Sequence, residues 1–323
     1  MKILKQMFRK PLQHLFPEPV NTPNDSDVHS DIWKTIRQIE VQARRRVNQL
    51  LSGQYHSTFK GSGLEFEEVT PYHEGDDERH IDWNVTARTG QLHVKRFIEE
   101  REMSLFLVVD NRSVVRFGSR KRLKHDLAIE FSALIAFSAL RNQDRVGLLT
   151  FGPGPHLMLP PRRGRQHALL LIRQLLTPRK NKIPVKGQDT LESTLKKLSH
   201  LMKRRGIIFV LSDFMNVGSL DTLKQLNQRH DCIAVQLRDP LEDQLPDVGR
   251  AAFEDPATGE ILQINTHDPS VRKAYAQLRA DAQAKLLAEF KTMGIDTLLL
   301  DTAGEDVWKP LLSYYRKRQH ARP

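Results

Sequence analysis

Residues 104–110 read SLFLVVD, a short apolar run that ends in an aspartate, and residues 206–213, GIIFVLSD, show the same pattern. A run of this length with almost no polar residue is typical of a strand that is buried on both faces. Such strands occur in parallel sheets, where helices cover each face. The two runs therefore predict an α/β fold.

The segments around these runs alternate between strand and helix signals. Apolar runs predict further strands at 145–151, near 156–159, at 232–237 and at 294–300. Apolar residues recur at helical spacing at 123–141, 165–176, 191–203, 220–228, 269–293 and 305–318, and a hairpin is expected at 252–264. Strands separated by crossover helices predict a doubly wound, mainly parallel sheet.

A helix is expected before this sheet domain. Ser30 or Asp31 can act as its N-cap and Gly53 can end it. Its apolar stripe consists of Ile32, Trp33, Ile36, Ile39, Ala43, Val47 and Leu50. We therefore divide the chain into a flexible basic N-terminus and linker (1–30), this helix with the following segment packed on the main domain (31–102), the main domain (103–318) and a tail (319–323).

Composition narrows the class of protein. The 323 residues include one cysteine, Cys232, which excludes an internal disulfide framework and a multi-cysteine zinc site. The sequence has no apolar run long enough to cross a bilayer and no secretory signal pattern, so a cytoplasmic location is expected. Residues 1–16 have a weakly amphipathic pattern that Pro11 interrupts; it is consistent with a frayed terminus or with peripheral contact at the inner face of the membrane.

The net charge of +11 is unevenly distributed. Residues 160–210 carry 13 basic and 2 acidic side chains, whereas residues 53–102 carry 6 basic and 11 acidic ones. A basic patch attracts nucleic acid, an acidic membrane or an acidic partner, although a solvated basic face with no ligand gives the same pattern. No aromatic residue lies between positions 162 and 186 to stack on bases, which argues against nucleic acid.

Two strand-terminal aspartates mark a candidate site. Asp110 and Asp213 would both lie at the carboxyl edge of the sheet, where ligands of open α/β sheets bind. If their strands are neighbours, the two carboxylates repel each other unless a cation, a proton or a guanidinium lies between them. The alternative is that each aspartate caps the loop or helix that follows it.

Residues 61–102, GSGLEFEEVTPYHEGDDERHIDWNVTARTGQLHVKRFIEERE, carry a family resemblance that continues into LFLVVD (105–110). Further matches are Asp144-Arg145-Val146-Gly147, Leu211-Ser212-Asp213-Phe214 and Arg238-Asp239-Pro240 with Glu242. Over roughly residues 35–315 the chain resembles the bacterial domain-of-unknown-function family fifty-eight, whose members end in a von Willebrand factor A-type domain. The resemblance implies a Rossmann-like fold of that type and association with AAA+ ATPases of the MoxR type.

The resemblance also implies a degenerate metal-ion-dependent adhesion site. The motif of full von Willebrand A domains is Asp-x-Ser-x-Ser, but here Arg112 and Val114 replace both serines after Asp110. Asp110, Ser113, Thr190 (or its neighbour Asp189) and Asp213 are the remaining metal candidates. Mg²⁺ prefers six oxygen ligands, so we expect Arg112 to replace the cation and pair with Asp110 or Asp213. The alternative is that Arg112 points to solvent and Ser113 helps to hold the metal.

The acidic block contributes candidate interaction residues, namely Asp76, Asp77, Arg79, Asp82, Trp83 and Arg88. A buried or half-buried ionic cluster of Asp82 and Trp83 with Arg88 would pin this segment against the sheet; alternatively, the segment is a docking surface for the ATPase. An acid/base pair of Asp76 and Asp77 lacks any accompanying nucleophile or pocket signal.

The sequence thus favours a non-enzymatic adaptor without a required cofactor, Mg²⁺ being the one candidate. Its expected partners are a MoxR-type AAA+ ATPase and an unidentified client protein. Binding of nucleic acid or of a membrane surface through residues 160–210 is the alternative, and a hydrolase that uses the aspartates is a third reading.

Overall fold

A six-stranded sheet forms the centre of the computed structural model, which describes residues 25–50, 64–99, 103–120, 122–153, 157–177, 190–254 and 260–321. The strand order is β10-β7-β6-β3-β4-β5. Only β5 runs antiparallel to its neighbour. The strands are β3 (Ser104–Asp110), β4 (Arg145–Phe151), β5 (Met158–Arg162), β6 (Ile207–Ser212), β7 (Asp231–Arg238) and β10 (Asp296–Asp301). The predicted doubly wound, mainly parallel α/β fold is confirmed.

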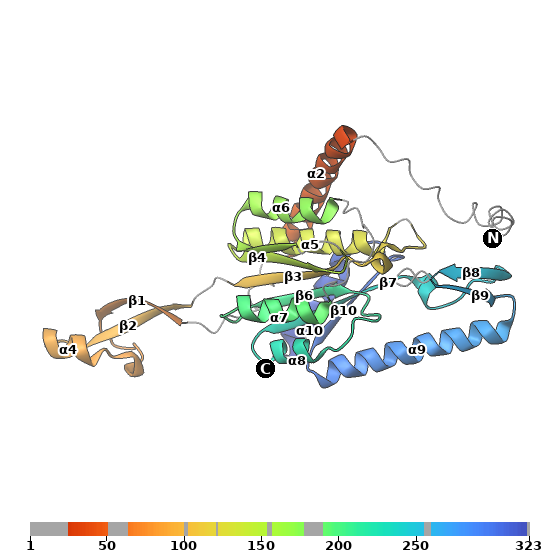
Figure 1. Ribbon diagram of the computed structural model, residues 1–323. Coiled ribbons are helices and arrows are strands. Elements are labelled where there is room, and N and C mark those ends of the chain that lie inside the picture. The colour runs from red at the N-terminus through yellow and green to blue at the C-terminus, as the bar shows by residue number, and fades with distance from the viewer. Residues whose placement is uncertain are drawn as a thin grey trace.

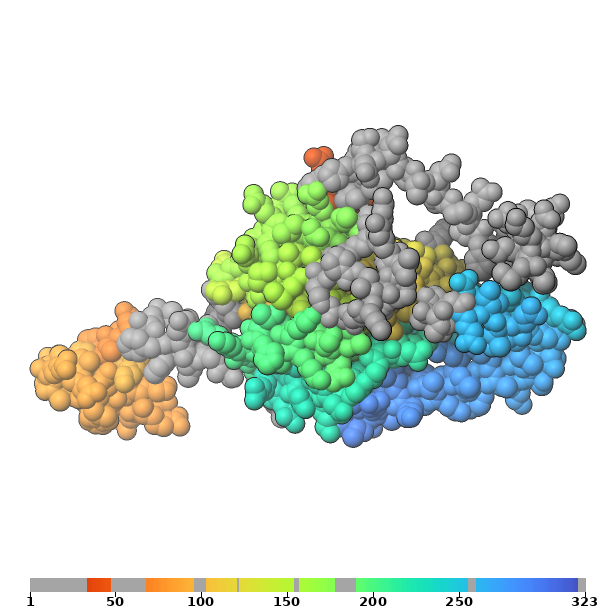
Figure 2. Space-filling model, in the orientation of Figure 1, coloured from red at the N-terminus to blue at the C-terminus, as the bar shows by residue number. Residues whose placement is uncertain are grey.

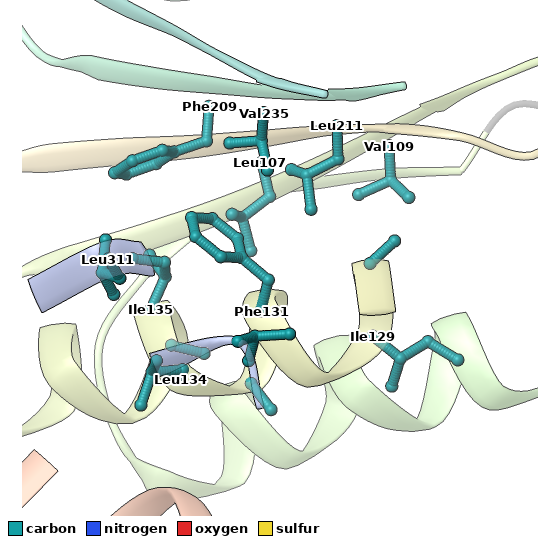
Figure 3. Packing of buried hydrophobic residues seen from close by; sticks show 14 of the residues in the cluster. Leu107, Val109, Ile129, Phe131, Leu134, Ile135, Phe209, Leu211, Val235 and Leu311 are labelled. Atoms are coloured by element: carbon teal, nitrogen blue, oxygen red, sulfur yellow. The ribbon is translucent and has the colours of Figure 1, made fainter. Parts of the chain in front are cut away.

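Four helices cover one face of the sheet. They are α2 (Asp25–Leu50), α5 (Lys124–Arg141), α6 (Arg165–Leu176) and α10 (Trp308–Ala321). Figure 3 shows side chains of α5, among them Phe131 and Ile135, directed at the strands. The rings of Phe131 and Phe209 meet edge to face with centroids 5.5 Å apart. Because α5 is apolar almost all round, it lies between the sheet and α2.

Three further helices cover the opposite face. They are α7 (Leu191–Leu201), α8 (Asp221–Asn227) and α9 (Pro269–Thr292). The ring of Phe290, near the end of α9, packs against that of Phe214 at 5.0 Å. Both faces of the sheet are therefore covered, which explains why β3 and β6 are apolar without alternation.

The N-terminal helix α2 is longer than the sequence pattern predicts. It begins at Asp25, so residues 25–30, expected as linker or cap, are already helical. Its side chains Ile36, Ala43 and Val47 are buried in the core. Glu40 forms an ion pair with Arg165 of α6, with Oε1 and Nε 2.7 Å apart. The rest of the proposed N-terminal region, residues 1–24, lies outside the described residues.

The acidic block forms a projecting arm. Its elements are β1 (Leu64–Pro71), the 3-10 helix η1 (Glu78–His80), α4 (Trp83–Thr89) and β2 (His93–Glu99). β1 and β2 pair antiparallel, with Leu64 opposite Glu99 at the base. In Figure 1 this arm stands away from the sheet, beyond the end at which β3 begins. The arrangement differs from the expected packing of the segment on the main domain: within 68–95 only Asp82 and Val94 are buried, so most side chains of this part remain at least partly exposed.

The opposite end of the molecule carries a second projection. The short 3-10 helices η2 (Ser113–Arg116) and η3 (Pro240–Glu242) follow β3 and β7. The predicted hairpin is present as β8 (Arg250–Glu254) and β9 (Ile261–Asn265), and α9 leads back from it. Figure 2 shows the β1–β2 arm and this hairpin at opposite ends. Within the described ranges, no helix is both long and apolar enough to cross a bilayer.

Candidate functional site at the carboxyl edge of the sheet

The fold brings Asp110 and Asp213 together. β3 and β6 are adjacent and parallel, with Val109 opposite Leu211, so the residues that follow emerge side by side. The side chain of Asp110 is fully buried and that of Asp213 nearly so. Two ionised carboxylates in such a place require a positively charged partner.

Arg112 supplies that charge. Its Nη2 atom lies 2.6 Å from Asp110 Oδ2 and 2.9 Å from Asp213 Oδ1. Its Nε atom donates to both oxygens of Asp110, at 3.0 and 3.1 Å. The guanidinium group therefore lies between the carboxylates and donates charge-assisted hydrogen bonds to each, as predicted.

The turn after β6 completes the binding of the guanidinium. Arg112 Nη1 donates to the carbonyl oxygen of Met215 at 2.7 Å. The Ser212 hydroxyl donates to Asp110 Oδ2 at 2.7 Å and accepts from the backbone N–H of Phe214 at 3.0 Å. Phe214 and Asn216 both have positive φ angles, 56° and 52°. This costly backbone conformation points the Met215 carbonyl group at Arg112.

A buried lysine extends the network. Lys124, the first residue of α5, has no exposed surface. Its Nζ atom lies 3.2 Å from Asp213 Oδ2 and 2.5 Å from Glu242 Oε1. Burial raises the pKa of Glu242, and the positive charge of Lys124 acts against that rise. The two oxygens of Asp213 thus face different cations, and Glu242 shares the second one.

Gly152 makes room for the loop that carries Arg112. Its φ angle is +120°, and a Cβ atom at this position would lie 2.9 Å from the backbone nitrogen of Arg112. The preceding residue, Phe151, places its ring 5.7 Å from the guanidinium carbon. Glycine is therefore required here both for its backbone conformation and for space.

The remaining metal candidates lie elsewhere or serve other contacts. Ser113 begins η2. Thr190 is exposed, and its hydroxyl accepts from the Ser193 backbone N–H at 3.1 Å, so it caps α7. Asp189 lies outside the described residues. Across the ranges that the structure describes, no three His, Cys, Asp or Glu residues form a metal-binding group.

This donor set does not fit Mg²⁺. The cation needs about six oxygen ligands in octahedral array, whereas the space between Asp110 and Asp213 holds a guanidinium. A divalent ion at that position would be repelled by Arg112 and would have to displace it from both carboxylates.

Asp239, just after β7, holds a second loop at the same edge. It is fully buried and accepts from the backbone N–H of Ser119 at 2.7 Å and from the Ser119 hydroxyl at 2.6 Å. The hydroxyl of Thr302 and the N–H of Leu241 also donate to it. Burial alone would raise the pKa of Asp239, but these hydrogen bonds hold it below the usual aspartate value.

The interaction residues expected in the acidic block lie far from this edge, on the arm. Asp77 pairs with Arg79 at 3.0 Å, and the hydrogen bonds from Arg79 lower the pKa of Asp77 to about 2. Asp76 accepts from the backbone N–H of His73 at 2.9 Å. These two acids are therefore engaged in local turn contacts.

The cluster expected from Asp82, Trp83 and Arg88 is not formed. Asp82 caps α4 by accepting from the N–H groups of the next turn, and its cationic partner is Lys95 at 3.5 Å. Arg88 is exposed in the last turn of α4, and Trp83 is 67% exposed. A helix of two turns is too short to bury both its cap and its tryptophan without a neighbouring element.

Comparison with known sequences places the chain in a family. A family model described as "Protein of unknown function DUF58" matches residues 68–285. The chain belongs to this family. An uncharacterised protein of Mycobacterium tuberculosis is 31% identical to this DUF58 chain over 268 residues, which are 83% of this chain and 84% of the relative.

Two solved structures also resemble the DUF58 chain. One is an aerotolerance-related membrane protein from Bacteroides fragilis, with a TM-score of 0.42 and 11% identity, over 68% of this chain and 99% of the other. The second is the VWA domain of SpRpn10, with a TM-score of 0.35 and 11% identity, over 65% and 94% of the two chains.

For three residues of this network the sequence predicted no role. Ser212 and Glu242 were visible only as parts of matching motifs. Lys124 stands in the basic run SRKRLKH (119–125), which resembles an ordinary solvated segment. Its burial depends on Asp213 and Glu242, 89 and 118 residues away, so no local pattern marks it.

Proposed function

We propose that this DUF58 chain is a non-enzymatic, cytoplasmic adaptor that acts with a MoxR-type AAA+ ATPase in the assembly or maturation of a client complex. A protein partner docks at the carboxyl edge of the sheet. The observation that supports this proposal is the closed ionic network of Asp110, Arg112, Asp213, Lys124 and Glu242 at that edge.

The network suits recognition better than turnover. A general acid or base exchanges a proton during a reaction and must be within reach of the substrate. Asp110 and Lys124 are instead fully buried and paired with opposite charges. Groups held in this way stiffen the loops of the edge, and stiff loops bind a partner with a smaller loss of conformational entropy.

The proposal includes a site that works without a metal. In a metal-dependent adhesion site, the bound ion would supply positive charge to an incoming carboxylate. Here the guanidinium of Arg112 is already paired with the carboxylates of Asp110 and Asp213. The partner is therefore expected to contact exposed residues around the network, such as Arg116 and Arg120, rather than a shared ion.

The basic stretch 160–210 gives less support to nucleic-acid or membrane binding. Its described part is divided between α6 on one face of the sheet and α7 on the other. Arg165 is paired with Glu40. These elements therefore do not form one continuous strip of cations that could bind a phosphate backbone or an anionic lipid surface.

Affinity capture of the intact protein from its own cells tests the adaptor. We expect mass spectrometry to identify a MoxR-type ATPase, and the double variant Arg116→Glu/Arg120→Glu to lose it. The matched control is Arg162→Glu/Arg163→Glu, which makes the same charge change on exposed residues at the edge strand β5. Failure to recover an ATPase, equal loss in both variants, or catalytic turnover by the chain alone would contradict the proposal.

A further inference from the structure

The distal end of the β1–β2 arm carries features of a docking surface. Residues 72–92 contain five acidic and two basic side chains in a protein whose net charge is +11. Trp83, at the start of α4 in this segment, is 67% exposed. An exposed tryptophan beside charged residues is a frequent centre of protein–protein binding energy.

The arm holds these features away from its own domain. Base and tip of the ribbon are separated by the eight residues of β1, with Leu64 opposite Glu99 at the base and Pro71 opposite His93 at the tip. At about 3.3 Å per residue this is roughly 25 Å. Figure 1 shows the tip directed outward. The acidic tip is therefore out of reach of the domain that carries it.

A basic surface lies at the foot of the same arm. The amino edge of the sheet gathers the exposed side chains of Arg145, Lys203, Arg204, Arg205 and Arg229. Backbone hydrogen bonds tie this edge together, from Arg145 to Met103 and from Asp231 to Gly206.

Two acids among the described residues of this edge are engaged with other groups. Asp144 is buried, with Oδ1 accepting from the N–H of Met103, and Asp231 is paired with Arg318. His230 is buried here, and its pKa is lowered first by burial and then by the charges of Arg229 and Arg205. Among the described side chains of this edge, cations therefore outnumber acids.

We infer that two copies of the chain associate face to face through their arms, with the acidic tip of each arm docked on the basic amino edge of the other copy. Tip and edge lie at the same end of the molecule, separated by the length of the arm. Two arms lying antiparallel therefore bring both tips to complementary surfaces at once. The result is a closed twofold dimer, the commonest symmetry of soluble oligomers. Trp83 is then covered at each contact.

Charge reversal in the full-length chain tests this dimer by analytical ultracentrifugation. The wild type is expected at twice the 37.2 kDa of one chain, and to dissociate between about 0.1 M and about 1 M salt, as the Debye length falls from roughly 10 Å to roughly 3 Å. Glu74→Lys/Asp76→Lys/Glu78→Lys, and separately Lys203→Glu/Arg204→Glu/Arg205→Glu, should each raise the dissociation constant at least about tenfold.

Mixing the two variants supplies the decisive control. In the mixed pair one contact joins a reversed tip to a reversed edge, and the other joins two unaltered surfaces, so both contacts are attractive. An equimolar mixture should therefore form a dimer although each variant alone is a monomer. A wild-type monomer at all salt concentrations, a dimer insensitive to both reversals, or no recovery on mixing would overturn the inference.

Crosslinking separates contact between copies from folding of an arm onto its own domain. Cys232 is the sole cysteine and is buried, so an introduced cysteine reacts selectively. A bifunctional maleimide should join Trp83→Cys chains to Arg204→Cys chains in a mixture. Without such a product, or with a crosslink only inside a chain that carries both substitutions, self-association is refuted. A tip that binds only the ATPase gives that same negative result.

Discussion

The guanidinium of Arg112 donates to the carboxylate of Asp213 at 2.9 Å, across 101 positions of sequence. This contact joins the loop after β3 to the turn after β6. Without Arg112, Asp110 and Asp213 would be like charges in a site with almost no water access. The attraction therefore offsets a repulsion that the sheet topology itself creates.

Replacing Arg112 with methionine should destabilise the protein strongly. The change keeps much of the side-chain bulk but leaves two buried carboxylates without their shared cation. Loss of one partner from a buried ion pair costs about 3–5 kcal/mol. The measurement is the free energy of unfolding from urea denaturation at pH 7. Arg116→Met, at an exposed position four residues later, is the control and should change stability by less than about 0.5 kcal/mol. Equal effects of the two substitutions would argue against the bridging role.

The double substitution Arg112→Ser/Val114→Ser should create a binding site for Mg²⁺. It removes the competing guanidinium and restores two hydroxyl ligands beside Asp110 and Asp213. Isothermal titration should show no saturable Mg²⁺ binding to the wild type and saturable binding to the double variant. Adding Asp110→Asn to the variant should abolish it. Saturable binding to the wild type, lost in Asp110→Asn, would show that the unmodified site accepts a metal.

Replacing Gly152 with alanine should destabilise the protein by more than the backbone strain at a positive φ angle alone, because the added Cβ atom would also contact the Arg112 loop. Gly152 and Gly164 both have positive φ angles, +120° and +99°, so either substitution causes strain. Only at position 152 would the added Cβ contact the backbone of Arg112, at 2.9 Å, whereas at 164 no atom lies within 4 Å. Gly152→Ala should therefore lower the free energy of unfolding by about 1–3 kcal/mol more than Gly164→Ala. Similar losses for both would remove the steric argument.

Asp239 should make part of the free energy of unfolding depend on pH in the acidic range. Hydrogen bonds from Ser119 and Thr302 lower its pKa in the folded state below the ordinary value of 3.8, so the unfolded chain binds the proton more tightly. The associated stability is present above that value and is lost as the pH falls below it towards the folded-state pKa. Asp239→Asn should remove this component.

Urea denaturation between pH 2 and pH 7 measures this effect. At pH 7 the asparagine variant should be less stable by about 1.5–3 kcal/mol, because its amide cannot accept from every donor that surrounds Asp239. The difference between the two proteins should shrink as the pH falls below 3.8. A difference that stays constant over the whole range would exclude ionised Asp239 as its source.

Much of the sheet could be predicted because its signals are local. The runs 104–110 and 206–213 are too apolar for a one-sided strand, and the spacing of residues 124–141 is helical on its own. The extension of α2 to Asp25 and the position of the arm were not predicted. Pro, Asn and Asp near the start of α2 gave a linker signal, and the arm has a β pattern that does not specify which surface it contacts.

The candidate site also has features that the sequence predicts and features that it does not. The alternation of apolar strands and helices predicts that Asp110 and Asp213 lie at the same edge of the sheet, but their contact requires β3 and β6 to be neighbours, which that alternation does not specify. The sequence does not predict that Lys124 and Glu242 complete the network, because neither residue type nor spacing distinguishes a buried lysine from a solvated one. Its partners come from the loops after β6 and β7, which meet only when the sheet is assembled.

The order of apolar and polar residues along the chain was thus enough to specify an α/β sheet with two acids at one edge, since burial of apolar surface depends on local periodicity. Which cation lies between those acids, where the acidic arm points and which cations gather at its foot were decided by tertiary structure. Electrostatic interactions depend on distances between charges in space, and residues a hundred positions apart acquire those distances only on folding.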